Sequence, residues 1–76
     1  MYEYTIVGRL AHPINGGTDT VTLAEITMKF RRDWEPGNQE TGEKLAELLM
    51  PALSPFAEGP DDMLQAHVLV AQEVTA

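Results

Sequence analysis

The chain contains no cysteine, so neither a disulfide nor a thiolate metal site can support its fold. Basic residues are also scarce: five of them stand against twelve acidic ones, for a formal net charge of −7. No apolar run approaches the roughly 18 residues that a membrane span needs. The chain opens Met-Tyr-Glu-Tyr, without a basic, apolar leader. We therefore expect a soluble, cytoplasmic protein without a membrane partner.

The residues of common catalytic and metal sites are few and scattered. His12 and His67 fall in different segments, without the spacing of a metal site. Ser54, the single serine, stands beside a proline, and no histidine–acid pair is placed by sequence to activate it. Asp61 and Asp62 lack the Asp-x-Asp-x-Asp-Gly pattern of a calcium loop. We expect no enzymatic activity, no cofactor and no metal.

A length of 76 residues predicts one domain, residues 1–76, with a thin core. Chains of this size bury only about 60% of the surface that their unfolded form exposes. Because disulfides are excluded, a second subunit is the simplest way to enlarge the core. We therefore expect a homodimer.

Alternating apolar and polar residues predict strands near both ends of the chain. Residues 2–10 place Tyr2, Tyr4, Ile6 and Leu10 on one face, and residues 63–74 alternate in the same way. Gly8 falls on the apolar face of the first strand, where it leaves room for a bulky neighbour or marks a bulge. Residues 12–19 are rich in turn formers and predict a hairpin loop.

Residues 20–32 allow two interpretations. Clean alternation from Ala24 and a high content of β-branched residues favour a strand. Against this, Thr22 and Glu25 form a capping-box pattern, and the apolar residues from Leu23 to Trp34 approximate helical spacing. We predict a strand.

An apolar stripe at helical spacing predicts one helix after the turn at residues 35–38. Its members are Leu45, Leu48, Leu49, Ala52, Leu53 and Phe56. Asn38 or Thr41 can cap this helix. Pro51 removes a backbone donor and predicts a kink or two short helices, and Gly59-Pro60 ends the segment. The fold class is α+β: a small antiparallel three-stranded sheet, β-β-α-β in order 2-1-3, with one kinked helix on one face.

One helix leaves the back face of this sheet uncovered, and we predict a partner or dimer contact there. The predicted apolar residues of this face are Val7, Val21, Leu23 and Leu69, with Arg9, Lys29 and Arg31 among the charged residues around them. Lys29 and Arg31 can instead neutralise the acids of this protein's own predicted helix. Trp34 either covers the open end of the core or anchors a contact.

The acidic residues suggest a protein partner. Residues 37–76 carry seven acids against Lys44 alone, which disfavours direct nucleic-acid binding and suits a partner with a basic surface. The predicted acidic contact consists of Glu40, Glu43, Glu47, Glu58, Asp61 and Asp62. We expect an interaction protein, such as an inhibitor or adaptor of a nucleic-acid-binding machine of the phage or mobile-element type. The alternatives are an assembly subunit that self-associates through its sheet and a small-molecule-binding or accessory enzyme subunit.

Overall fold

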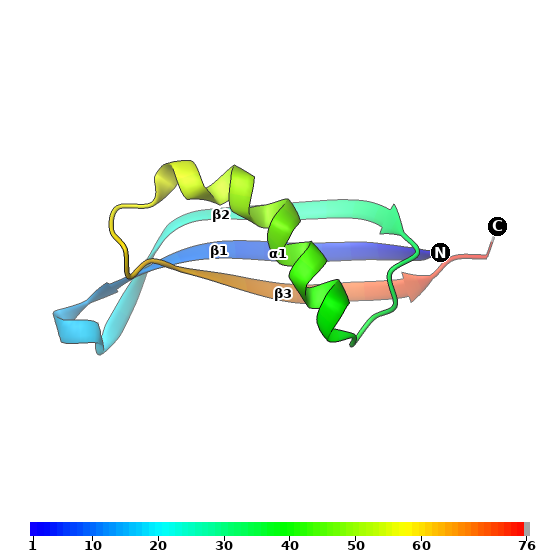
Figure 1. Ribbon diagram of the computed structural model, residues 1–76, viewed down its shortest axis with the longest axis horizontal. Helices are drawn as coiled ribbons and strands as arrows, with labels where there is room; N and C mark the ends of the chain where they lie inside the picture. The colour runs from blue at the N-terminus through cyan, green and yellow to red at the C-terminus, as the bar shows by residue number, and fades with distance from the viewer. Residues whose placement is uncertain (76) are drawn as a thin grey trace.

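The computed structural model describes residues 1–75 and contains one sheet and one helical layer (Figure 1). The elements are β1 (Tyr2–Ile14), a 3₁₀ turn η1 (Asn15–Gly17), β2 (Asp19–Arg32), α1 (Gln39–Leu53), a 3₁₀ turn η2 (Ser54–Phe56) and β3 (Met63–Glu73). The three strands are antiparallel in the order β2-β1-β3. The predicted α+β class, element order and strand order are confirmed.

Residues 20–32 lie within β2, and the helical alternative is wrong. The segment pairs with β1 from Ile14 opposite Asp19 to Tyr2 opposite Arg32, with Leu23 as the one unpaired residue. Pairing lets Ala24, Ile26, Met28 and Phe30 pack against the core on the face shared with α1. Tertiary burial of this alternating set outweighs the local capping-box signal.

Two β-bulges change which side chains share a face. In β2, Leu23 is the extra residue opposite the step from Leu10 to Ala11 of β1. In β3, Leu69 is the extra residue opposite the step from Thr5 to Ile6 of β1. Strict alternation therefore fails on β2 and β3, because one extra residue exchanges the two faces of the strand beyond it.

Because of the first bulge, the predicted positions of Leu23 and Val21 on the back face are wrong. Leu23 packs against the core instead, and Val21 stands opposite His12, on the face that Leu10 shares with α1. The second bulge moves Val70 onto the back face opposite Thr5, and Ala71 onto the core face opposite Tyr4.

Helix α1 crosses the sheet diagonally, with its N-terminal end on the β3 side and its C-terminal end on the β2 side (Figure 1). Asn38 is the N-cap, because its side chain accepts a hydrogen bond of 2.8 Å from the Glu40 N–H. Leu45, Leu49 and Leu53 are buried against β1. Leu49 sits directly over Gly8, so the glycine leaves room for a bulky neighbour as predicted.

The C-terminal part of the predicted stripe departs from the core. α1 continues through Pro51 and ends at Leu53, and the 3₁₀ turn η2 begins at Ser54. Two helical segments therefore meet, three residues after Pro51. Phe56 lies beyond this junction and is 57% exposed. The turn of tighter pitch rotates Phe56 away from the face that Leu45 and Leu49 bury.

Aromatic side chains close the other end of the core. Tyr4 is fully buried and stacks on Phe30, and Phe30 meets Trp34 edge-on. The Tyr4 hydroxyl donates a hydrogen bond to the Trp34 carbonyl at 2.5 Å. Burial raises the pKa of Tyr4. Trp34 therefore covers the open end of the core, the first of its two predicted roles.

Candidate functional site

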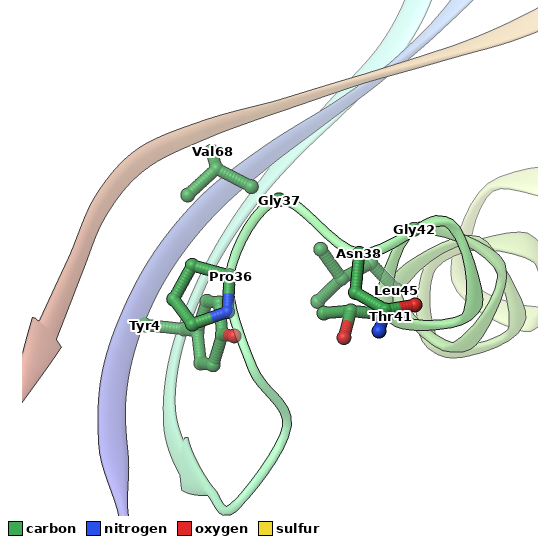
Figure 2. A pocket seen from close by; sticks show the side chains of 8 residues that line it. All are labelled: Tyr4, Pro36, Gly37, Asn38, Thr41, Gly42, Leu45 and Val68. Atoms are coloured by element: carbon green, nitrogen blue, oxygen red, sulfur yellow. The ribbon is translucent and has the colours of Figure 1, made fainter.

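A groove lies between β3 and the N-terminal half of α1 (Figure 2). Its volume is about 320 Å³. Figure 2 shows Tyr4, Pro36 and Val68 on one side of it, and Asn38, Thr41 and Leu45 on the other. Gly37 and Gly42 complete the lining, and the absence of side chains at these two positions keeps the groove open.

The loop beside the groove is held in place by its own hydrogen bonds. Gly37 adopts a φ of 81°, in the left-handed region that favours glycine. The buried Thr41 hydroxyl donates to the Glu35 carbonyl at 2.7 Å, which ties the first turn of α1 to the preceding loop. The groove is therefore preformed.

Strand β3 borders this groove and is an edge strand with three consecutive exposed apolar residues. Val68, Leu69 and Val70 are 48%, 60% and 47% exposed. The only ionisable residues of β3 are His67 and, at its end, Glu73. Val68 faces the groove, whereas Val70 lies on the back face opposite Thr5. At Val68 and Val70 this edge is therefore apolar on both faces.

The other edge strand is built differently. β2 carries five charged side chains in its fourteen residues: Asp19, Glu25, Lys29, Arg31 and Arg32. Charged side chains protect an exposed edge from pairing with another chain. Of the two edges, β3 is the one without this protection.

The back face retains part of its predicted composition. Val7 lies there between Thr27 and His67, and Arg9 lies between Glu25 and Gln65. Arg31 binds Glu3 at 3.3 Å, and Lys29 stands opposite Thr5 and is exposed. The charge of Arg31 is thus paired with an acid of the sheet rather than with one of the helix.

The predicted acidic surface is divided into two groups. Glu40, Glu43 and Glu47 are exposed on α1, whereas Glu58 and Asp61 are exposed in the loop between η2 and β3. This loop follows the C-terminal end of the helical layer (Figure 1). The two ends of α1 are about 21 Å apart. A partner that contacts the first group does not automatically reach the second.

Asp62 does not belong to the acidic surface, because its side chain is only 2% exposed. Its Oδ1 lies 2.5 Å from His12 Nδ1, and its Oδ2 accepts hydrogen bonds from the N–H groups of Glu58 and Gly59. Hydrogen bonding to His12, then to these two N–H groups, lowers the pKa of Asp62. Asp62 is a structural residue that joins the loop to β1.

Replacing Asp62 with asparagine is expected to lower the melting temperature at neutral pH. The folded-state pKa lies below the unfolded value of about 3.9, so the carboxylate stabilises the fold above about pH 4. That stabilisation disappears as pH falls through the folded-state pKa. Thermal unfolding followed by circular dichroism should show the two proteins converging in acid. Asp61→Asn, at the exposed neighbour, is the control, and a difference that persists unchanged at about pH 2 would contradict this assignment.

The groove was not predicted from the sequence, although two of its lining residues are glycines near the start of the helix. Gly37 and Gly42 flank the helix start, but a groove depends on where Val68 of a distant strand lies. Within residues 1–75 no group of three or more histidine, aspartate or glutamate side chains is placed to hold a metal ion.

Comparisons with known proteins leave the geometry as the only guide to function. A scan of family models, a search of curated proteins and a search of solved structures found no significant match to this chain. Among residues 1–75, no helix has the length and hydropathy needed to cross a membrane.

Proposed function

We propose that this α+β protein is an interaction module that receives an extended segment of a protein partner along β3. The observation that carries the proposal is the contrast between the two sheet edges. β2 is charged along its length, whereas β3 exposes Val68, Leu69 and Val70 in succession. An edge strand offers a row of unpaired N–H and C=O groups, and an added strand satisfies them.

The geometry of β3 supports strand addition despite the bulge at Leu69. Residues 63–68 pair with β1 in uninterrupted register, which leaves six residues, or about 20 Å, of regular edge. The groove lies on the α1 side of this edge, where alternate side chains of an added strand would point. Backbone pairing supplies affinity in such complexes, and pockets beside the strand supply specificity.

Peptides selected from a random display library on the immobilised protein are expected to bind along β3. Binding should slow the exchange of β3 amide hydrogens, measured by nuclear magnetic resonance. Leu69→Lys should weaken binding roughly tenfold or more, because a lysine on an edge strand opposes pairing.

Thr27→Lys places the same charge on β2 and is the matched control. Binders that leave the β3 amides unprotected, or that bind both variants equally, would refute strand addition. An experiment that yields no binder would do the same.

Self-association through the back face is a second candidate, supported by the single helical layer. α1 covers one face, while Val7, Val70 and the exposed Leu69 remain without a covering layer in residues 1–75. A second copy placed there would enlarge a thin core. Sedimentation equilibrium separates the candidates, because a concentration-dependent dimer that Val70→Lys dissociates supports this one.

We also propose an identity for the partner, which is a nucleic-acid-binding machine with a basic surface. An inhibitor or adaptor of a nucleic-acid-binding machine would use exposed acids to occupy a basic surface. Glu40, Glu43 and Glu47 support it because all three remain exposed on α1. Binding through them would weaken as salt rises, since exposed charges are screened.

A further inference from the structure

We propose that the partner segment on β3 inserts an apolar side chain into the groove and places a lysine or arginine against Glu43, the exposed acid next to Gly42 on α1. This inference rests on the proposed function and adds the chemistry of the partner. It follows from three properties of the groove: its lining, the charge around it and its position beside the strand edge.

The lining of the groove suits an apolar side chain. Tyr4, Pro36, Leu45 and Val68 supply mostly carbon atoms. Each polar side chain that borders the groove already makes one hydrogen bond within the chain. The Tyr4 hydroxyl donates to the Trp34 carbonyl and the Thr41 hydroxyl to the Glu35 carbonyl, while the Asn38 side-chain oxygen accepts from the Glu40 N–H.

The volume of the groove also favours an apolar side chain as its occupant. At about 320 Å³ the groove lies at the lower end of the range of about 300–1,000 Å³ typical of small-molecule sites. Since few polar groups are free to orient a ligand, a buried apolar side chain matches the groove better than a polar small molecule.

The segment that supplies most of the lining of the groove is acidic in sequence. Residues 33–47 carry Asp33, Glu35, Glu40, Glu43 and Glu47, with Lys44 as the sole basic residue. Lys44 and Glu40 already pair with each other at 3.4 Å, and Lys44 Nζ also lies 5.6 Å from the centre of the Trp34 ring. Glu43 is outside this pair. Charge complementarity therefore favours a cation from the partner.

A second copy of the chain fits this site poorly. In an antiparallel pair of β3 strands, both copies present α1 on the same face, with its N-terminal half on the β3 side (Figure 1). The acidic N-terminal halves of α1, which carry Glu40 and Glu43, would then lie on the same face of the joined sheet. β3 itself carries no lysine or arginine to compensate them. The occupant that we propose is a different protein.

The test uses a synthetic blocked peptide, Thr-Thr-Lys-Thr-Leu-Thr-Lys-Thr-Thr. In an added strand its leucine and two lysines lie on one face, because side chains two residues apart share a face. Titration into the isotope-labelled protein should shift the amide signals of the groove and of β3. Changing the leucine to alanine should weaken binding about 10–100-fold, and changing both lysines to glutamate should weaken it at least as much.

Substitutions in the protein test the same contacts from the side of the groove. Gly42→Leu is expected to fill the groove and weaken binding about tenfold or more, while Gly42→Ala should bind more tightly than Gly42→Leu. Both variants should fold, because a Cβ at Gly42 meets no atom within 4 Å and both residues favour helix more than glycine. Glu43→Lys should weaken binding, whereas Glu58→Lys, in the distant loop, should not.

The outcomes distinguish this inference from the proposed function. No signal change at about 1 mM peptide, or binding that Gly42→Leu and Glu43→Lys leave unchanged, overturns the inference. If β3 amides are still protected by library-selected peptides, strand addition stands without the groove. Loss of binding in Gly42→Leu together with unprotected β3 amides would instead assign the groove a ligand that does not pair with the strand.

Discussion

Replacing Leu49 with alanine is expected to lower the free energy of unfolding by about 2–5 kcal/mol. Leu49 is fully buried and lies where α1 crosses Gly8 of the central strand. Alanine removes the buried methyl groups and leaves a cavity between the helix and the sheet. A domain of this length has a total stability of about 4–11 kcal/mol, so this one change removes a large share of it.

Urea unfolding followed by tryptophan fluorescence measures the effect through Trp34. Met50→Ala is the matched control, because Met50 is the next residue of the same helix and is exposed. Its effect should stay within about 0.5 kcal/mol. Equal destabilisation by the two substitutions would show that α1 does not pack on the sheet through Leu49.

Replacing Gly8 with alanine is expected to destabilise the fold by about 1–3 kcal/mol. A Cβ at this position would lie 2.7 Å and 2.9 Å from the two methyl carbons of Leu49. Leu49 is enclosed and cannot swing away at low cost. The sign is informative, because in an ordinary strand position alanine is more favourable than glycine.

Combining the two substitutions tests the contact itself. In Gly8→Ala/Leu49→Ala the added methyl group enters the space that Leu49 vacates, so the double variant should lose less stability than the sum of the singles. Additive losses, or a stabilising Gly8→Ala, would contradict the close approach of α1 to β1. The same urea titration provides all four values of the cycle.

These two predictions bear on the proposed partner site. The groove exists because α1 is seated on β1 at Gly8 and diverges toward β3, where Gly37 and Gly42 leave its wall open. A substitution that lifts the helix also changes the groove. Binding experiments on core variants therefore report on fold and site together, which is why Gly42 and Leu69 are the better positions for testing function.

Most of the fold was predictable because its signals are local. Alternation over residues 2–10 and the helical stripe from Leu45 to Leu53 each bury one face, and the Asn38 cap begins the helix where the sequence allows it. The short connection between the first two strands makes them antiparallel, and the helix returns the chain to the opposite edge of β1.

The candidate site was predictable only in part. Exposed Glu40, Glu43 and Glu47 follow from helical periodicity, but the burial of Asp62 depends on His12, fifty residues earlier. The bulges at Leu23 and Leu69 each insert one extra residue and exchange the faces of the residues beyond it. Strict alternation would put Val70 in the core and Val21 on the back face, whereas the structure has Val70 on the back face opposite Thr5 and Val21 opposite His12 on the side of α1.

The amino-acid sequence by itself determined the α+β class, the order of the strands and the excess of negative charge, since periodicity, turn residues and composition are local properties. Only the tertiary structure decided which edge is left apolar, where the groove opens and which acids are available. Those features depend on register and on the distance between α1 and the sheet, which are set by packing between segments far apart in the chain.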